Sequence, residues 1–241
     1  MTIRIAMWSG PRNISTAMMR SWENRTDCQV VDEPFYAFYL QQTQSPHPCF
    51  KEILATQSDD YQQVTQQLTK SHVDAKYQYQ KHMTHHMLDG VDLDWTAELK
   101  HCFLIREPSE IVNSYTNSRG VCSANDIGII RQAELFDEIG RITGQAIPVI
   151  DSNRVLTSPQ TVIPEMCAAL DIEFDSKMLT WPTGKRESDG VWASHWYHSV
   201  ENSTGFAKVE KRPFSLNPQQ LAVVEEVLPY YEKLKSHVIN G

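Results

Sequence analysis

The stretch Gly10-Pro-Arg-Asn-Ile-Ser-Thr16 contains residue types that can bind a phosphate group. A Gly-Pro-Arg turn exposes backbone N–H groups. The Ser-Thr pair after it is typical of a helix start, whose unpaired N–H donors and partial positive charge attract anions. A Walker A loop would need Gly-x-x-x-x-Gly-Lys-Ser/Thr, but no second glycine and no lysine follow Gly10. The stretch therefore predicts a phosphate site in which Arg12 supplies the charge.

A second candidate for anion binding lies at Arg106, which ends a short apolar run and precedes Pro108. In P-loop NTPases, the corresponding strand tends to end in the Asp that holds Mg²⁺. An arginine in its place would repel a metal ion and attract an anion. The guanidinium of Arg106 and the hydroxyl of Ser114, eight residues later, could both face one phosphate. Alternatively, Arg106 pairs with Glu107 or Glu110 beside a capped helix.

The two motifs resemble the signatures of the sulfotransferases that use 3′-phosphoadenosine 5′-phosphosulfate (PAPS). In that family, Pro-Lys/Arg-x-x-Ser/Thr-Thr binds the 5′-phosphosulfate and Arg-x-Pro-x-x-x-x-x-Ser binds the 3′-phosphate. The resemblance implies PAPS as donor, adenosine 3′,5′-bisphosphate as product and no metal ion. The donor-binding residues that it implies are Arg12, Asn13, Ile14, Ser15, Thr16, Arg106 and Ser114.

The resemblance extends in order over roughly residues 3 to 200. The stretch Lys185-Arg186-Glu-Ser-Asp-Gly-Val-Trp192 looks like the family's basic Gly-x-Trp loop, which closes on the nucleotide, so Lys185 and Arg186 are further donor-binding candidates. Two positions depart from the pattern. The family often has glycine or serine where Ile14 stands, and cytosolic members more often have lysine in place of Arg12.

Sulfuryl transfer needs a base for the acceptor's proton, and the strongest candidate is Glu33, directly after the second predicted strand. Some carbohydrate-directed sulfotransferases carry a Glu-Pro-Phe/Tyr at this point, whose glutamate is a proposed base. Arg12 would stabilise the charge that develops on the leaving phosphate. Alternatively, Asp32 or Glu33 caps a turn before the proline. The run Val30-Val-Asp-Glu33 also looks like a Walker B strand.

Three histidines in the stretch Lys81-His-Met-Thr-His-His86 form a second set of base candidates. Cytosolic sulfotransferases place a catalytic histidine just after a lysine at the end of the equivalent strand, but here the matching offset falls on Met83. His85 is our catalytic candidate from this set, with His82 and His86 as alternatives. Their spacing would suit metal ligands on a helix, but no partnering cysteine or Glu-x-x-His pattern supports a metal. Histidines that line a pocket or the surface are the simpler interpretation.

A stretch rich in aromatic residues lies toward the end of the chain. It contains Trp192, Trp196, Tyr197 and Phe206 around His195 and His198. These rings could line the acceptor pocket, stack on adenine or pack in the core. The basic residues that follow, Lys208, Lys211 and Arg212, are expected to form a solvated turn.

Apolar stretches that alternate with helical segments must position these residues. We expect strands at Ile3–Trp8, Gln29–Val31, Tyr77–Gln80, Cys102–Ile105 and Ile147–Ile150. Helices should follow the caps at Asp59 or Asp60, at Ser158 and at Asn217, and Pro229 should break or bend the last one. This alternation predicts an α/β, three-layer, P-loop NTPase-like fold with a mostly parallel sheet covered on both faces. We expect one domain over residues 1–241, with helical insertions at about 41–75 and 84–99.

Composition limits the partners of the chain. The formal net charge of −8 over 241 residues argues against general affinity for nucleic acid. No apolar run approaches twenty residues, and the N-terminus lacks the apolar region of a signal peptide. Five scattered cysteines without a Cys-x-x-Cys pair favour reduced thiols in a cytoplasmic protein. The expected partner is a small-molecule acceptor, with no nucleic acid and no membrane.

The functional hypothesis is a PAPS-dependent sulfotransferase that acts on a hydroxyl or amine of a small-molecule or carbohydrate acceptor. One alternative is a Mg-ATP-dependent P-loop kinase for a small molecule, with Asp32 as its metal ligand. Another is a non-catalytic nucleotide-binding module. Acceptor specificity should lie in the connections 35–72 and 83–99, which carry no readable motif.

Overall fold

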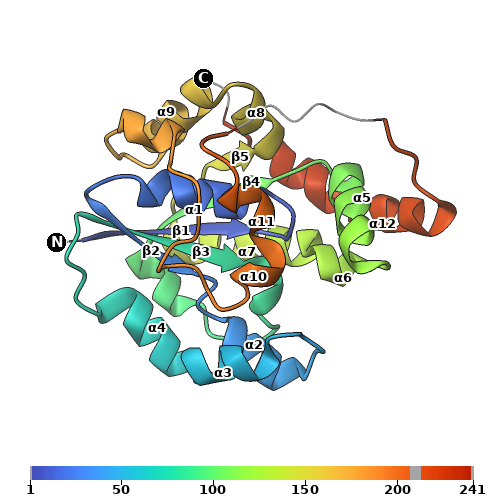
Figure 1. Cartoon of the computed structure of the whole chain (residues 1–241), viewed down its shortest axis with the longest axis horizontal. Coiled ribbons are helices and arrows are strands. Elements are labelled where there is room, and N and C mark those ends of the chain that lie inside the picture. Colours follow the sequence, from blue (N-terminus) through green and yellow to red (C-terminus); the bar gives the residue numbers. More distant parts are fainter. Residues whose placement is uncertain (1, 207–212, 240–241) are drawn as a thin grey trace.

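A five-stranded parallel sheet forms the centre of the computed structural model, which describes residues 2–206 and 213–239 (Figure 1). The strands are β1 (Ile3–Ser9), β2 (Cys28–Asp32), β3 (Tyr77–Met83), β4 (Lys100–Ile105) and β5 (Val149–Asp151). Their order is β2-β3-β1-β4-β5, and every neighbouring pair is parallel. All five predicted strands are therefore present, with bounds that differ by a few residues.

Helices connect the strands. They are α1 (Ser15–Glu23), α2 (Tyr36–Thr43), α3 (Phe50–Thr56), α4 (Tyr61–Lys70), α5 (Pro108–Arg119), α6 (Ala124–Ile127), α7 (Ile129–Thr143), α8 (Ser152–Thr157), α9 (Pro159–Ala169), α10 (Ala193–Trp196), α11 (His198–Glu201) and α12 (Pro218–Lys235). Three 3₁₀ turns are η1 (Thr84–His86), η2 (Asp94–Glu98) and η3 (Ser176–Leu179). None of the described helices is long and apolar enough to cross a bilayer.

Both faces of the sheet are covered, as alternate side chains of β1 show. Ile5 and Met7 are fully buried on one face, where α1, α8 and α9 pack. Ala6 and Trp8 are fully buried on the other, against α4, α5, α7 and α12. Figure 1 shows the sheet in the middle of the molecule with α8 and α9 on one side of it. The three-layer α/β fold predicted from the sequence is confirmed.

The parallel register brings the carboxyl ends of four strands to one edge of the sheet. Ser9 at the end of β1 is level with Met83 of β3 and Leu104 of β4, and Asp32 of β2 is level with Lys81. The connections after these strands begin at residues 10, 33, 84 and 106. Open parallel sheets bind ligands at this edge, and all the predicted site residues except Lys185 and Arg186 lie in the connections after these strand ends.

Helix caps largely follow the sequence signals. Asp60 accepts a hydrogen bond from the backbone N–H of Gln63, and Asn217 forms a capping box with Gln220. Of the break or bend predicted at Pro229, the break is wrong, because α12 runs through this residue from Pro218 to Lys235. Burial of α12 side chains on both sides of Pro229 against the sheet layer holds the helix together despite the missing N–H donor. The predicted basic turn at Lys208, Lys211 and Arg212 lies outside the described residues.

Candidate active site

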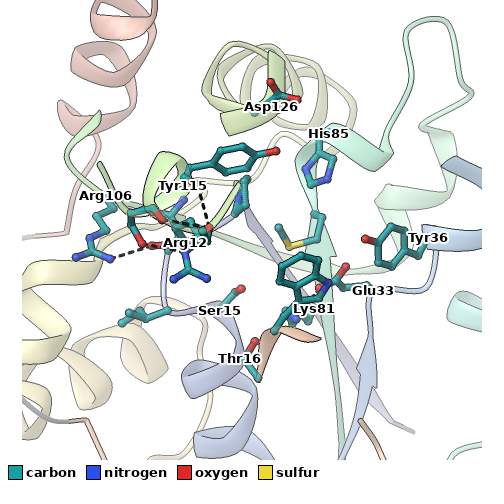
Figure 2. A pocket seen from close by; sticks show the side chains of 18 of the residues that line it. Arg12, Ser15, Thr16, Glu33, Tyr36, Lys81, His85, Arg106, Tyr115 and Asp126 are labelled. Atoms are coloured by element: carbon teal, nitrogen blue, oxygen red, sulfur yellow. Dashed lines mark hydrogen bonds and ion pairs between the residues drawn. The ribbon is translucent and has the colours of Figure 1, made fainter. Parts of the chain in front are cut away.

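A cavity of about 930 Å³ opens at the carboxyl edge of the sheet. Its walls come from the loop after β1, the ends of β2 and β3, helix α5 and the segment of α10 and α11. In Figure 2 the labelled side chains, which include Arg12 of the loop after β1, Lys81 of β3 and Tyr115 of α5, surround one space. Among the residues predicted for the site, the lining includes Arg12, Asn13, Ile14, Ser15, Thr16, Glu33, His85, Arg106 and Ser114.

The loop between β1 and α1 has an unusual backbone at two positions. Arg12 has φ 64° and Ile14 has φ 56°, both in the left-handed region. A β-branched residue is strained there and glycine is not, which accounts for the glycine that the resembled family often has at this position and leaves Ile14 itself unexplained. Gly10 cannot carry a side chain, because a Cβ would lie 2.3 Å from the Ile127 carbonyl oxygen. The loop is therefore held close to the α6–α7 junction in one conformation.

The structure brings the two predicted anion-binding motifs into direct contact. The guanidinium Nε of Arg12 donates to Ser114 Oγ over 2.9 Å, and Arg106 Nη1 donates to the Arg12 carbonyl over 3.0 Å. Figure 2 draws Arg12 and Arg106 beside each other at the cavity wall. Arg106 Nε also donates to Glu110 over 2.9 Å, so the alternative pairing with Glu110 is present as well. Residues 94 positions apart thus share one wall of the cavity.

Positive charge accumulates at this wall. Desolvation lowers the pKa of Arg12 below its ordinary value, and the nearby charges of Arg106 and Arg119 lower it further. Arg12 Nε donates to the neutral hydroxyl of Ser114, so this hydrogen bond does not balance the positive charge of Arg12. An anion bound at this wall would relieve the repulsion between the three guanidinium groups. The wall is therefore suited to phosphate or sulfonate groups.

A buried ionic cluster lies beside the anion wall, which is formed by Arg12, Arg106, Ser114 and Arg119. Lys81 Nζ donates to Asp32 Oδ1 over 2.9 Å, to Glu33 Oε1 over 2.8 Å and to the hydroxyl oxygen of Tyr197. Asp32 also accepts from the Tyr197 hydroxyl over 2.7 Å and from the backbone N–H of Gly190 over 3.1 Å. Burial alone would lower the pKa of Lys81, but Asp32 and Glu33 hold that pKa well above its ordinary value. Lys81 is therefore a buried cation that forms ion pairs with two carboxylates.

The two carboxylates of the cluster have different surroundings. Asp32 uses both oxygens for protein donors. Glu33 places one oxygen on Lys81, and its other oxygen lies 4.0 Å from His86 Nε2. Burial raises the pKa of Glu33, although Lys81 opposes the shift. Because a general base works best when its pKa approaches the operating pH, Glu33 is better suited to accept a proton from a ligand in the cavity.

The histidine candidates separate into three environments. His82 points to the core, where it stacks on Trp8 at 4.4 Å and contacts Gln80, and it does not line the cavity. His86 is buried and stacks on Tyr36 at 4.3 Å. His85 lines the cavity, and burial together with Arg119 lowers its pKa to about 4. The three do not share a helical face, because His82 belongs to β3 and the others to η1.

The aromatic stretch near the end of the chain divides between core and cavity. Trp192 is fully buried and donates from Nε1 to the Tyr197 hydroxyl over 3.1 Å. Trp196, Tyr197 and Phe206 line the cavity. The two histidines of this stretch, His195 and His198, are exposed. Trp192 therefore packs in the core, the other three rings lie at the cavity, and their contact with an acceptor or with adenine stays a prediction.

Lys185 and Arg186 are not brought to the cavity. Lys185 is exposed, and Arg186 donates to the Lys185 carbonyl over 3.0 Å and lies 3.7 Å from Glu23 of α1. The carboxylate of Glu23 and the carbonyls of its own turn hold the Arg186 guanidinium away from the anion wall. Of the Lys185–Trp192 stretch, Gly190 contacts the site through Asp32, and Trp192 contacts it through the Tyr197 hydroxyl.

Sequence reasoning gave no site role to Lys81 or Arg119, and it named Tyr197 only as one ring of an aromatic stretch that could line a pocket or pack in the core. Lys81 carried a weak signal, as a lysine at the end of an otherwise uncharged strand. Tyr197 lies 116 positions from Lys81, and no local pattern announces the contact. The guanidinium of Arg119, at the end of α5, lies 4.2 Å from the ring centre of Trp196.

Within residues 2–206 and 213–239, no group of three or more His, Cys, Asp or Glu side chains is arranged to hold a metal ion. At Asp32, the residue expected to bind Mg²⁺ in a kinase, the ammonium group of Lys81 takes the place of a cation. A divalent ion there would have to displace a buried lysine and a tyrosine hydroxyl. The arrangement thus disfavours the kinase alternative.

Comparison with known proteins gives one family match that spans most of the chain. The family model described as "Sulfotransferase domain" matches residues 3–238. Two curated proteins of Arabidopsis thaliana, named branched-chain-amino-acid aminotransferase-like proteins 1 and 2, are 33% and 30% identical over 234 residues. These alignments cover 97% of this chain but 42% of each relative. The chain thus spans less than half the length of the curated relatives it matches.

The solved structures with a similar fold include two that are named as sulfotransferases. A sulfotransferase domain from the curacin biosynthetic pathway has a TM-score of 0.59 at 14% identity, covering 95% of this chain and 98% of that one. A sulfotransferase from Alicyclobacillus acidocaldarius has a TM-score of 0.57 at 9% identity, covering 100% and 98%. At such identities the likeness shows the shared fold.

Proposed function

Because the chain belongs to the sulfotransferase domain family, we propose that it transfers a sulfuryl group from PAPS to a hydroxyl or amine of a small-molecule or carbohydrate acceptor. The contact between Arg12, Arg106 and Ser114 carries the proposal, because it joins two anion-binding motifs at one cavity wall. PAPS has a phosphosulfate and a separate 3′-phosphate, so a donor site for it needs two such motifs. The chemistry of the wall fits that requirement.

In this proposal, donor binding, leaving-group stabilisation and proton removal are assigned to different residues. Arg106 and Ser114 would bind the 3′-phosphate, and Arg12, Ser15 and Thr16 with the loop N–H groups would bind the 5′ end. PAPS supplies the sulfuryl group and a phosphate leaving group. Arg12 would stabilise the charge that develops on that leaving group. Glu33 would take the proton from the acceptor, and His85 would contact the acceptor as a neutral imidazole.

Ligand-dependent stabilisation tests the donor assignment. Adenosine 3′,5′-bisphosphate at a hundred times its Kd should stabilise the protein by about 2.7 kcal/mol, and ATP with Mg²⁺ should stabilise it much less. Arg106→Ala should abolish the shift with the bisphosphate. Arg141→Ala removes an exposed arginine of α7 that does not line the cavity and should leave the shift unchanged. Stabilisation by ATP–Mg²⁺ alone would refute the proposal.

Substitution of the base tests the chemical step. In Glu33→Gln the amide oxygen can still accept from Lys81, so donor binding should persist. Transfer from radiolabelled PAPS to a panel of phenols, sugars and amines should fall about 10²- to 10⁴-fold, the usual contribution of a general base. A Glu33→Gln variant that transfers at the original rate would exclude Glu33 as the base. A panel that gives no transfer, with bisphosphate binding intact, would favour the non-catalytic module.

A further inference from the structure

The hydroxyl of Tyr197 occupies the centre of the buried cluster, between the α10–α11 segment and the sheet. It donates to Asp32 at 2.7 Å and accepts from Lys81 and, at 3.1 Å, from Trp192 Nε1. Tyr197 is 3% exposed. Burial and the neighbouring Asp32 raise the pKa of Tyr197 well above its ordinary value. The hydroxyl therefore stays protonated and donates a hydrogen bond to Asp32. All hydrogen-bonding capacity of this oxygen is used.

This hydroxyl determines how Lys81 is shared. Lys81 has three N–H donors, which go to Asp32, Glu33 and Tyr197. Asp32 can share the ammonium group because the Tyr197 hydroxyl and the Gly190 N–H also donate hydrogen bonds to its carboxylate. Without the hydroxyl, Asp32 would lose a short hydrogen bond and draw Lys81 toward itself. The 2.8 Å contact between Lys81 and Glu33 would then weaken.

We propose that Tyr197 is a positioning residue, whose hydroxyl satisfies Asp32 so that the ammonium group of Lys81 stays on the Glu33 carboxyl group. The catalytic meaning of this role rests on the proposed function, in which Glu33 is the base. Tyr197 would thereby connect the segment that begins at Gly190 to the base. That segment packs tightly, because a Cβ at Gly190 would lie 2.2 Å from the ring of Trp192. A shift of this segment would move the Tyr197 hydroxyl and change the charge state of Glu33.

Several charged or titratable groups surround Glu33, and a test must separate them. They are Asp32 at the end of β2, Tyr36 of α2, Lys81 of β3, His86 of η1, Arg119 of α5 and Tyr197 between α10 and α11. Two substitutions act on the sharing of Lys81 in opposite directions. Tyr197→Phe should weaken the Lys81–Glu33 contact, and Asp32→Asn should leave Lys81 to Glu33 alone.

The experiment is a titration of the Glu33 side-chain carboxyl by NMR in protein labelled with [δ-¹³C]glutamate, with the signal assigned by its loss in Glu33→Gln. Tyr197→Phe should raise the pKa of Glu33 by about one pH unit, equivalent to a tenfold change in its ionisation equilibrium. Asp32→Asn should lower it. The control is Tyr79→Phe, which removes an equally buried hydroxyl from β3 that has no hydrogen-bond partner among the described residues. This control should leave the pKa unchanged.

An unchanged pKa of Glu33 in a folded Tyr197→Phe variant overturns the proposal, because a purely structural tyrosine would alter stability without moving this titration. If Tyr197→Phe does not fold, 3-fluorotyrosine at position 197 decides, because its more acidic hydroxyl is a stronger donor to Asp32 and a weaker acceptor from Lys81 and changes no charge beside Glu33. A lowered pKa of Glu33 supports the sharing of Lys81, and an unmoved one refutes it. The titration needs no donor and no acceptor. A failure of bisphosphate binding would therefore refute the proposed function and leave this result readable. With an acceptor found, the acidic limb of the rate profile should move with the Glu33 pKa.

Discussion

Removal of the Lys81 ammonium should destabilise the protein far more than removal of an ordinary lysine. In Lys81→Met the carboxylates of Asp32 and Glu33 lose their shared cation. The side chains of Lys81, Asp32 and Glu33 are only 1%, 2% and 10% exposed, so water cannot replace it. Breaking a buried ion pair by removal of one partner costs about 3–5 kcal/mol. We expect a loss of this size in the free energy of unfolding at pH 7.5.

The sign of the pH dependence follows from Glu33. Without Lys81, the pKa of Glu33 in the folded protein should rise further above its unfolded value, because burial raises it already and the opposing cation is gone. A folded state that binds more protons than the unfolded one gains stability as the pH falls. The deficit of Lys81→Met relative to the original protein should therefore shrink between pH 7.5 and pH 5.5.

Urea unfolding followed by circular dichroism measures both effects. The matched control is Lys100→Met in β4, because Lys100 lies 3.9 Å from a fully exposed Asp171 and such pairs contribute little. The double variant Lys81→Met/Glu33→Gln should recover at least about 1 kcal/mol of the loss, because neighbouring sites in one network are not additive. If Lys81→Met costs no more than Lys100→Met, the cluster is not the ionised network described above.

Three further predictions concern stability. Gly10→Ala should destabilise the protein by more than about 2 kcal/mol in urea unfolding, because its Cβ would lie 2.3 Å from the Ile127 carbonyl and the loop would have to move. Ile14→Gly should be about 1 kcal/mol more stable than Ile14→Ala, the reverse of the usual ranking in helices, because φ is 56° at this position. Burial lowers the pKa of His82 to about 3 and that of His101 to about 4. The stability that each neutral histidine contributes is therefore fully present above its unfolded pKa of about 6.5. It falls by about 2 kcal/mol for each histidine between pH 7 and pH 5. His82→Phe should reduce that loss by about 2 kcal/mol in the same assay, and an equal loss in both proteins would contradict the burial argument.

The strands, and the place of the two predicted anion-binding motifs at one edge of the sheet, could be predicted from the sequence because their signals are local. The apolar runs at Ile3–Trp8 and Cys102–Ile105 have the length and composition of buried strands. A loop or helix start directly after such a strand lies at the carboxyl edge of a parallel sheet. The contact between Arg12 and Ser114 then follows from topology, since β1 and β4 are neighbours.

The cluster around Lys81 could not be predicted in this way. Its geometry depends on the register between β2 and β3, which places Asp32 level with Lys81, and on the return of Tyr197 to the sheet from a distant segment. Neither is encoded in a short pattern. Arg186 shows the converse case, in which a motif was visible but the Glu23 carboxylate holds the side chain elsewhere.

Donor binding and proton transfer should depend on pH independently, because different groups carry them. The anion wall uses arginines, which stay charged throughout the accessible range, and loop N–H groups, which do not titrate. The affinity for adenosine 3′,5′-bisphosphate should therefore be constant from pH 7 to pH 9, where the phosphates are fully ionised. Glu33 is the cavity carboxylate whose pKa burial raises, so transfer should fall on the acidic side. Calorimetric titration across this range tests the first statement, and a tenfold change in Kd would show that a titratable group takes part in donor binding.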